Sequence, residues 1–177
     1  MADADGATKF SDFEKLEAKM KQIQKNGEGL VIGSRAHLKE SKVEVFSSRE
    51  NLVFSNIKIF FFFNQRKFVR VVLAKGFNLI VRFVGVEGLK DTQCGFKLFS
   101  RKCAERLILN QHIERFAFDV ELLYLAQSFK IPISEVAVNW KEIEGSKLSP
   151  LKATIEMTRD MMRIRIAYWL GIWKKFY

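Results

Sequence analysis

A short apolar strand pattern directly after an amphipathic helix pattern most strongly limits how this chain folds. Four apolar residues recur at helical spacing, with lysines on the other face of the same helix: Phe13, Leu16, Met20 and Ile23. A capping-box pattern, Ser11 to Glu14, overlaps the start of this helix. Gly29 to Ile32 then has the composition of a buried strand and leads into Gly33-Ser34-Arg35. This order predicts an α/β layer whose functional site lies at strand ends.

Hydrophobic periodicity predicts four more helices and one more strand. The expected helices cover residues 69–86, 101–109, 118–129 and 153–176, and the expected strand covers 133–140. Loops are expected at 91–97 and 142–148. Residues 51–65 contain five of the chain's 17 phenylalanines but lack the alternation of a half-buried strand. We interpret 51–65 as a doubtful insertion.

The charge of the chain is concentrated in one part. Residues 1–50 carry nine basic and nine acidic side chains, whereas residues 51–177 carry 21 basic and 11 acidic ones, so the net charge of +10 lies there. We therefore expect this part to meet an anionic partner. The chain's 177 residues suit one domain, and its two cysteines, Cys94 and Cys103, match neither a disulfide framework nor a zinc motif.

A membrane surface is the expected anionic partner. No apolar stretch reaches the roughly 20 residues that span a bilayer without charges. In 153–176 cationic and aromatic residues alternate with aliphatic ones, including Arg159, Arg163, Arg165, Tyr168 and Trp173. This composition is typical of a helix that lies in the membrane interface. A nucleic-acid partner is not expected, because the cations stand beside long apolar residues and no nucleic-acid motif is present.

An acidic pair stands at the start of the chain. Asp3 and Asp5 are two residues apart, so in an extended segment both carboxylates point to one side. Such a pair suits Mg²⁺ or Mn²⁺, which would bridge the diphosphate of a nucleotide. Taken by themselves, the three residues favour a solvated acidic terminus over a metal site, so the remaining motifs must decide between the two interpretations.

Five motifs follow one another along the chain: Asp3 to Phe10, Gly33-Ser34-Arg35-Ala36, Asp91 to Lys97, Phe118 to Leu123 and Glu144 to Leu148. Together they resemble the dolichyl-phosphate β-glucosyltransferases, which are inverting family 2 glycosyltransferases with a GT-A fold. The resemblance covers nearly the whole chain except about 43–65. It implies an α/β, partial GT-A (Rossmann-like) fold that lacks its N-terminal nucleotide-binding half and carries amphipathic membrane-interface helices. The expected division is a catalytic part, 1–150, and a membrane-interface helix, 151–177.

The resemblance also implies a reaction. Members of the family transfer glucose from UDP-glucose to dolichyl phosphate at the cytosolic face of the endoplasmic reticulum membrane, which supplies a lipid-linked donor for N-glycosylation. The aspartates that match the metal-binding pair are Asp3 and Asp5, and the expected metal is Mg²⁺ or Mn²⁺. Arg35 matches a phosphate-binding arginine, for which its planar fork is suited. Arg70, in the basic helix that follows, is the candidate for the acceptor phosphate.

Four further residues are expected near the substrates. Asp91 and Gln93 lie in a glycine-containing loop and are candidates to orient a sugar hydroxyl, although a turn-stabilising aspartate fits equally well. Asp119 and Glu121 stand about 200° apart on one helix and should have different roles. By resemblance Asp119 is the candidate base or orienting group, with Glu121 as alternate. Lys147 is either a phosphate contact or a solvated lysine.

The family carries a membrane helix and nucleotide-binding βα units ahead of its acidic pair, whereas here Met1 stands two residues before Asp3. We therefore expect a truncated chain that has little or no transferase activity alone. The alternative is a non-catalytic membrane-peripheral fragment or isoform of such an enzyme.

Overall fold

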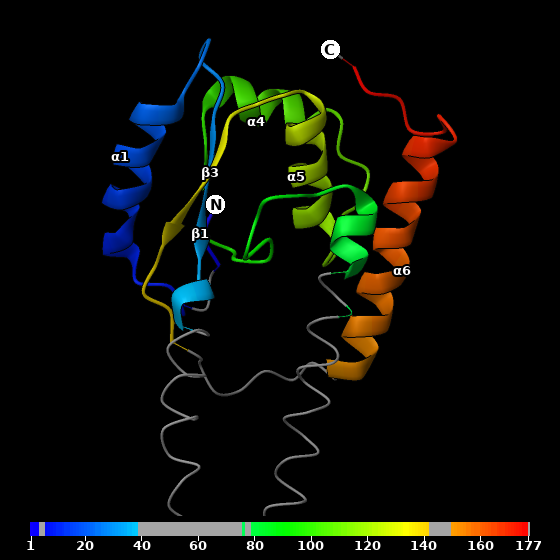
Figure 1. Ribbon diagram of the computed structural model, residues 1–177, viewed down its shortest axis with the longest axis horizontal. Helices are drawn as coiled ribbons and strands as arrows, with labels where there is room; N and C mark the ends of the chain where they lie inside the picture. The colour runs from blue at the N-terminus through cyan, green and yellow to red at the C-terminus, as the bar shows by residue number, and fades with distance from the viewer. Residues whose placement is uncertain (4–5, 39–75, 77–78, 142–149, 177) are drawn as a thin grey trace, which may run out of the picture.

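The computed structural model describes residues 1–3, 6–38, 76, 79–141 and 150–176 (Figure 1). A 3₁₀ turn, η1, at Phe10–Asp12 leads into helix α1 at Phe13–Ile23. The other elements are β1 at Leu30–Ser34, a short helical segment at 79–84, β2 at Lys97–Phe99, α4 at Arg101–Ile108, α5 at Phe118–Ser128, β3 at Ile133–Ala137 and α6 at Pro150–Trp169.

The three strands form one mixed sheet in the order β2-β1-β3. The central strand, β1, runs parallel to β3, from Leu30 opposite Ile133 to Ser34 opposite Ala137. It runs antiparallel to β2, with Ile32 opposite Lys97. Every residue of β1 is buried, so this strand forms the centre of the described fold.

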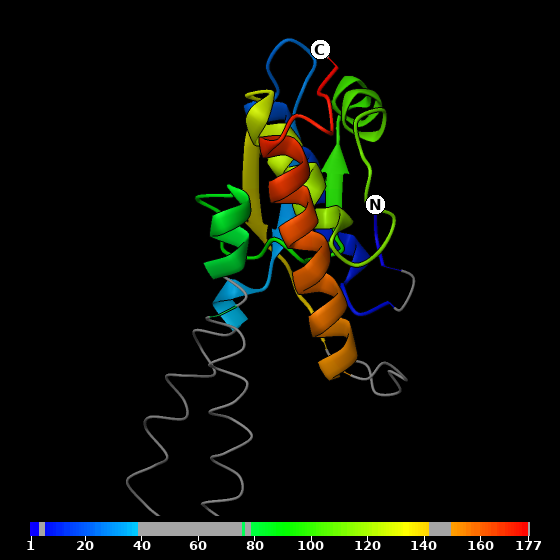
Figure 2. The same ribbon diagram turned by 90° about the vertical axis from the view of Figure 1, so that its right-hand side faces the viewer.

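Helices cover both faces of the sheet. Successive side chains of β1 point to opposite faces, and the apolar ones pack against a helix on each face. Val31 packs with Leu16 and Met20 of α1 on one face. Leu30 and Ile32 belong to a larger core on the other face, which includes residues of α4, α5 and α6. Figures 1 and 2 show the result: α1 lies on one side of the sheet, α5 on the other, and α6 forms an outer layer beyond α5.

The helix expected at 153–176 is present but ends earlier, at Trp169. Gly171 adopts a left-handed backbone conformation with φ of 69°, and the backbone N–H of Ile172 donates to the carbonyl of Ala167 over 2.9 Å. This is a Schellman-type helix end. The following residues fold back, and the backbone N–H of Phe176 donates to Asn110 Oδ1 over 2.6 Å.

Most expected elements are confirmed: the first helix, the strand at its end, α4, α5 and β3 all lie where periodicity places them. Besides the end of α6, two details are wrong. Strand β2 was not expected, and it begins at Lys97, the last residue of the expected loop. The capping box is not formed, because Asp12 is the residue before α1 and makes no side-chain cap. The expected helix at 69–86 is described at 76 and 79–84, where it is helical. The interpretation of 51–65 falls outside the described residues.

The described part of the chain contains no helix that is long and apolar enough to span a bilayer.

Candidate functional site

The first residues of the chain run along the free edge of β2. The terminal ammonium of Met1 donates to the carbonyl of Lys97 over 2.8 Å, and the backbone N–H of Lys97 donates to the carbonyl of Met1 over 3.0 Å. This pairing carries Asp3 to Gly95, where a β-carbon added to the glycine would collide with the Asp3 carboxylate. Glycine at position 95 therefore allows the carboxylate to approach the backbone.

A buried ion pair lies beside this segment. Lys97 Nζ donates to Asp119 Oδ1 over 2.7 Å and to the carbonyl of Cys94 over 2.6 Å. Burial raises the pKa of Asp119, the Lys97 ammonium opposes that rise, and the negative charge of Asp3 adds to it. The Arg35 guanidinium also lowers this pKa. The candidate residues Asp3, Arg35 and Asp119 are thus close enough to affect one another electrostatically.

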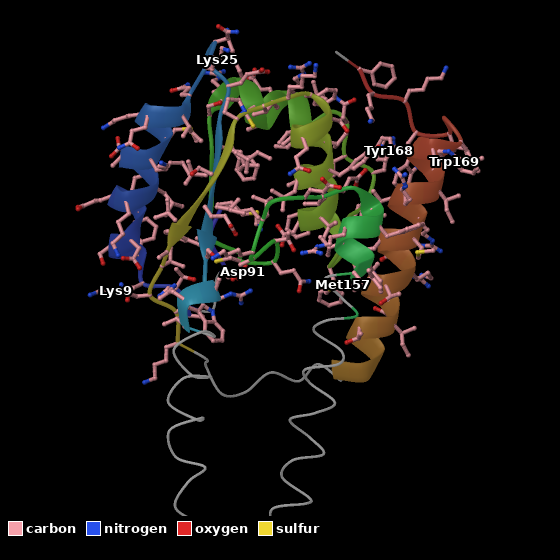
Figure 3. The ribbon with its side chains drawn as sticks, viewed as in Figure 1. Lys9, Lys25, Asp91, Met157, Tyr168 and Trp169 are labelled. Carbon is pink, nitrogen blue, oxygen red and sulfur yellow. The ribbon has the colours of Figure 1, made fainter. Side chains whose placement is uncertain are left out.

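Arg35 and Asp91, which were expected to contact substrates separately, bind each other. Arg35 Nε and Nη2 donate to the two carboxylate oxygens of Asp91 over 2.7 and 2.8 Å, and the backbone N–H of Arg35 donates over 2.9 Å. These hydrogen bonds raise the pKa of Arg35. The backbone N–H of Asp91 in turn donates to Glu135 of β3. Figure 3 shows Asp91 near the carboxyl end of β1, so the loop is fixed to the sheet there.

Gln93 and Glu121 face other parts of the fold. The side-chain amide of Gln93 donates to the sulfur of Met157 in α6 over 2.8 Å. The Glu121 carboxylate is fully buried and accepts from the backbone N–H groups of His112 and Ile113 and from the Tyr168 hydroxyl. Asp119 and Glu121 therefore have different surroundings, as their angular separation on the helix predicts. Asp5, Arg70 and Lys147 lie outside the described residues.

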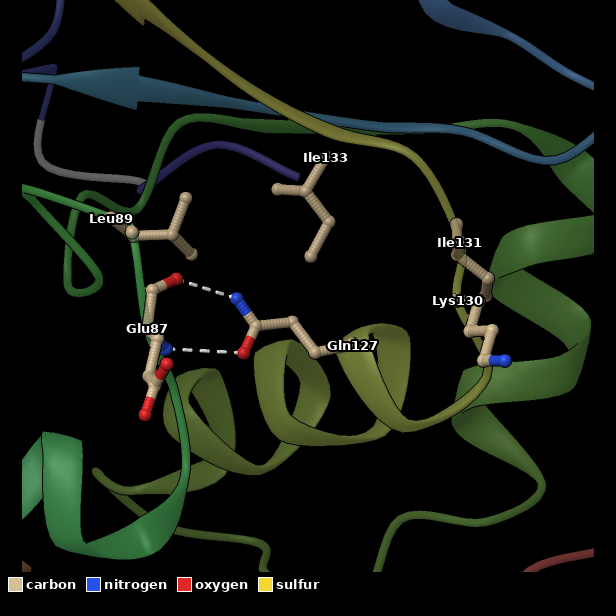
Figure 4. A pocket seen from close by; sticks show the side chains of 7 residues that line it. Glu87, Leu89, Gln127, Lys130, Ile131 and Ile133 are labelled. Carbon is tan, nitrogen blue, oxygen red and sulfur yellow. Dashed lines mark hydrogen bonds between the residues drawn. The ribbon is translucent and has the colours of Figure 1, made fainter.

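A separate cavity of about 360 Å³ lies by the start of β3. It is lined by Glu87, Gly88, Leu89, Gln127, Lys130, Ile131 and Ile133. Figure 4 shows Gln127 across it, with its amide bonded to the backbone N–H and carbonyl of Glu87. The candidate site residues that the structure describes do not line this cavity.

Comparison with known proteins gives one consistent result. The chain is 50% identical to a dolichyl-phosphate beta-glucosyltransferase of Dictyostelium discoideum, over 98% of the chain and 47% of that protein. Identity is 47% to the enzyme of the same name from Homo sapiens and 37% to that from Saccharomyces cerevisiae, in both cases over 98% of the chain and 48% of the relative. No protein-family model matches the chain, and no solved structure matches it.

This chain is a homologue of the dolichyl-phosphate beta-glucosyltransferases. It spans about half the length of these curated relatives. The mixed α/β sheet with helices on both faces is consistent with part of a glycosyltransferase fold.

Of the predicted metal-binding pair, only Asp3 lies within the described residues. Asp3 is exposed, and its carboxylate forms no hydrogen bond or ion pair with another described residue, which suits an oxygen ligand for a hard cation. Across the described ranges, no group of three or more His, Cys, Asp or Glu side chains is placed to hold a metal ion. Asp3 is therefore a fitting ligand but an incomplete site.

Lys97 is the site residue that sequence reasoning missed. A lysine in a short segment is ordinarily a solvated surface residue, and nothing in its spacing marks it as buried. One signal was present: Lys97 stands between apolar neighbours, Phe96 and Leu98, two residues after Gly95 of the matched motif.

Proposed function

We propose that this chain takes part in the transfer of glucose from UDP-glucose to dolichyl phosphate, which gives dolichyl β-D-glucosyl phosphate for protein N-glycosylation. The observation that carries the proposal is the 37–50% identity, across 98% of the chain, to proteins named for this product. The site geometry supports it, because Asp3, Arg35 and Asp119 are close enough to interact. The proposed location is the cytosolic face of the endoplasmic reticulum membrane.

The acceptor sets the chemical demand on the site. A phosphate monoester has its second pKa near 6, so it is already largely ionised at neutral pH and needs less help from a general base than a hydroxyl acceptor would. In this proposal Asp119 chiefly orients the acceptor for in-line attack on the sugar. Mg²⁺ or Mn²⁺, held by Asp3 and Asp5, would neutralise the departing diphosphate.

Arg35 is proposed to contact a phosphate while it remains bound to Asp91. A guanidinium has five N–H donors, and Nε and Nη2 each donate one hydrogen to Asp91. The other hydrogens point away from that carboxylate, and the side chain is 22% exposed. Asp91 thereby fixes the direction in which Arg35 presents its charge, and this is the role that we propose for Asp91 in place of a sugar contact.

The outer side of α6 and the residues after it are proposed to lie on the membrane surface. This region carries exposed large apolar side chains: Ile155, Met162, Ile166, Trp169, Leu170 and Ile172. Arg159 and Arg163 stand among them and are about half exposed. Apolar residues in the acyl boundary with arginines among lipid phosphates are the features of an interfacial helix. Tyr168 and Trp173, in contrast, pack against the core.

The test is a transfer assay with the purified chain, radiolabelled UDP-glucose, dolichyl phosphate in phospholipid vesicles and Mn²⁺. The Dictyostelium discoideum relative, of which the chain spans 47%, is assayed in parallel. Labelled dolichyl glucosyl phosphate that disappears with EDTA would support the proposal, and its formation by the chain alone would overturn the expectation that the truncated chain has little or no transferase activity. Asp119→Asn should lower the rate about a hundredfold, consistent with loss of an orienting contact, whereas Glu114→Gln, an exposed carboxylate just before α5, should leave it unchanged.

The outcomes separate the proposed activity from its alternative. Vesicle binding by the chain without any transfer, while the relative is active, would indicate a membrane-peripheral protein that does no chemistry. An unchanged rate in Asp119→Asn would remove Asp119 from the reaction.

A further inference from the structure

Lys97 is the largest side chain that the described fold buries completely, with 0% exposure. It begins β2, and its backbone lies opposite Ile32 of the central strand. A buried ammonium group is unfavourable unless it is paired and hydrogen-bonded. The Lys97 ammonium is both paired and hydrogen-bonded, because Nζ contacts the Asp119 carboxylate at 2.7 Å and the Cys94 carbonyl at 2.6 Å.

The same residue also places the other carboxylate of the site. The backbone N–H and C=O of Lys97 pair with Met1, two residues from Asp3. Its side chain reaches Asp119 at the start of α5. Lys97 thus joins the strand-edge segment that carries Asp3 to the helix that carries Asp119. Its positive charge accompanies the negative charges of these two carboxylates.

The ion pair leaves one oxygen of Asp119 for other contacts. Lys97 binds Oδ1, and no described residue donates a hydrogen bond to Oδ2. The Asp119 side chain keeps 12% of its surface exposed, whereas that of Lys97 keeps none. Of the two side chains, only that of Asp119 is open to contact with a ligand.

We propose that Lys97 is a positioning residue for glucosyl transfer: it anchors Asp119 through Oδ1 and so holds Oδ2 toward the substrate side of the site, beside Asp3 and Arg35. This inference rests on the proposed function. Lys97 does not touch the substrate in this arrangement and acts only through Asp119. A residue that acts through another should lose its effect when that other residue is removed.

The test compares Lys97→Met, Lys97→Arg, Asp119→Asn and the double variant Lys97→Met/Asp119→Asn. Each substitution is made in the chain and at the aligned position of the Dictyostelium discoideum relative, and kcat and the KM for UDP-glucose are measured. Lys97→Met should lower kcat about a hundredfold and change KM less than about threefold. Lys97→Arg keeps a cation and should recover at least about a tenth of the wild-type kcat. The control is Lys102→Met, an exposed lysine of α4, which should be unchanged.

The double variant separates positioning from folding. Each single substitution strands a buried charge, because Lys97→Met leaves the Asp119 carboxylate without its cation and Asp119→Asn leaves the Lys97 ammonium without its anion. The double variant strands neither charge. The double variant should therefore fold, as judged by circular dichroism, and its kcat should equal that of Asp119→Asn. A kcat of the double variant below that of Asp119→Asn, or full kcat in a folded Lys97→Met, overturns the positioning role of Lys97 and leaves the proposed function standing. Absence of transfer by both wild-type proteins overturns the proposed function, and the positioning role with it.

Discussion

Glu121 is a buried carboxylate whose donors come from two separate parts of the chain. The backbone N–H groups of His112 and Ile113 lie in the loop before α5, and the Tyr168 hydroxyl lies in α6 and donates over 2.9 Å. The His112 ring stacks on Trp173 with 4.5 Å between ring centroids. A buried charge satisfied in this way holds its surroundings together, so we assign Glu121 a structural part in joining α5 to α6.

Tyr168→Phe tests this assignment. It removes one hydrogen bond to a buried charged group, and we expect the free energy of unfolding to fall by about 2 kcal/mol at pH 7, measured by urea denaturation. Tyr124→Phe is the matched control, because the Tyr124 hydroxyl accepts from Lys175 in a half-buried position. Lys175 keeps its hydrogen bond to Ser128 and stays accessible to water, so the loss should be below about 1 kcal/mol. Equal losses in the two variants would contradict a special role for the Glu121 contact.

The same contact predicts a pH dependence at the alkaline end. Burial and the neighbouring Glu121 carboxylate raise the pKa of Tyr168 above the ordinary tyrosine value of 10.0. A group with a raised pKa in the folded protein gives its full stabilisation below the unfolded pKa and loses it as the pH rises through the folded pKa. The stability advantage of wild type over Tyr168→Phe should therefore be constant up to about pH 10 and shrink above it.

Asp12 should show the opposite sign. Burial acts to raise its pKa, but hydrogen bonds from Lys15 and from Asn139 outweigh burial, so the pKa lies below the ordinary aspartate value of 3.8. Its stabilisation is present above pH 3.8 and is lost as the pH falls below it. Asp12→Asn should cost about 1–2 kcal/mol at pH 7 and less at pH 3. Glu14→Gln, an exposed carboxylate in the same turn, should stay within about 0.5 kcal/mol of wild type at both pH values.

At the scale of residues, sequence predicts which side chains gather and misses how they pair. The angular separation of Asp119 and Glu121 follows from helix geometry, and their different surroundings are confirmed. The bidentate contact between Arg35 and Asp91 joins residues 56 positions apart, and motif order carries no information on such a contact. The ion pair of the buried Lys97 joins it to Asp119, 22 positions away, and is also non-local.

Among the elements, Ser100 joins the start of α4 to the residue before β1. Its hydroxyl accepts from the backbone N–H of Cys103 over 3.4 Å and from that of Gly29 over 3.1 Å. Ser100→Ala removes both contacts, and thermal unfolding should show a loss of about 1–2 kcal/mol. Ser11→Ala is the control, because Ser11 is exposed and α1 has no side-chain cap. A loss of 1 kcal/mol or more in Ser11→Ala would restore the capping box.

The helices and the central strand are predictable because their apolar periodicity is local. Strand β2 is not, because it has only three residues and is defined by its partners, β1 and the Met1 segment. The end of α6 was also misplaced: apolar and cationic residues continue past Trp169, and the turn at Gly171 stops the helix nonetheless. A single glycine is a weak signal when the pattern around it continues.

In the molecule as a whole, α6 lies between the proposed membrane surface and the Asp91 loop of the candidate site. Its inner side packs Met161 and Ile164 into the core beside α5, and Met157 accepts the hydrogen bond from Gln93 in the loop that follows Asp91. Its outer side carries the exposed apolar residues. A helix in this position would keep a fixed distance between a lipid surface and the Asp91 loop, so membrane attachment and acceptor delivery are expected to depend on the same element.

Vesicle binding tests the outer side of α6 directly. Trp169 is 76% exposed, and Leu109, after α4, is 80% exposed, so the pair offers matched apolar positions on different elements. Trp169→Glu should weaken binding of the chain to phosphatidylserine-containing vesicles at least about tenfold, because it removes roughly 1.5–3 kcal/mol of apolar burial and adds a negative charge. Leu109→Glu adds the same charge elsewhere and should have little effect. Equal weakening by the two substitutions would mean that general electrostatic attraction to the +10 chain, and not the α6 surface, holds it on the membrane.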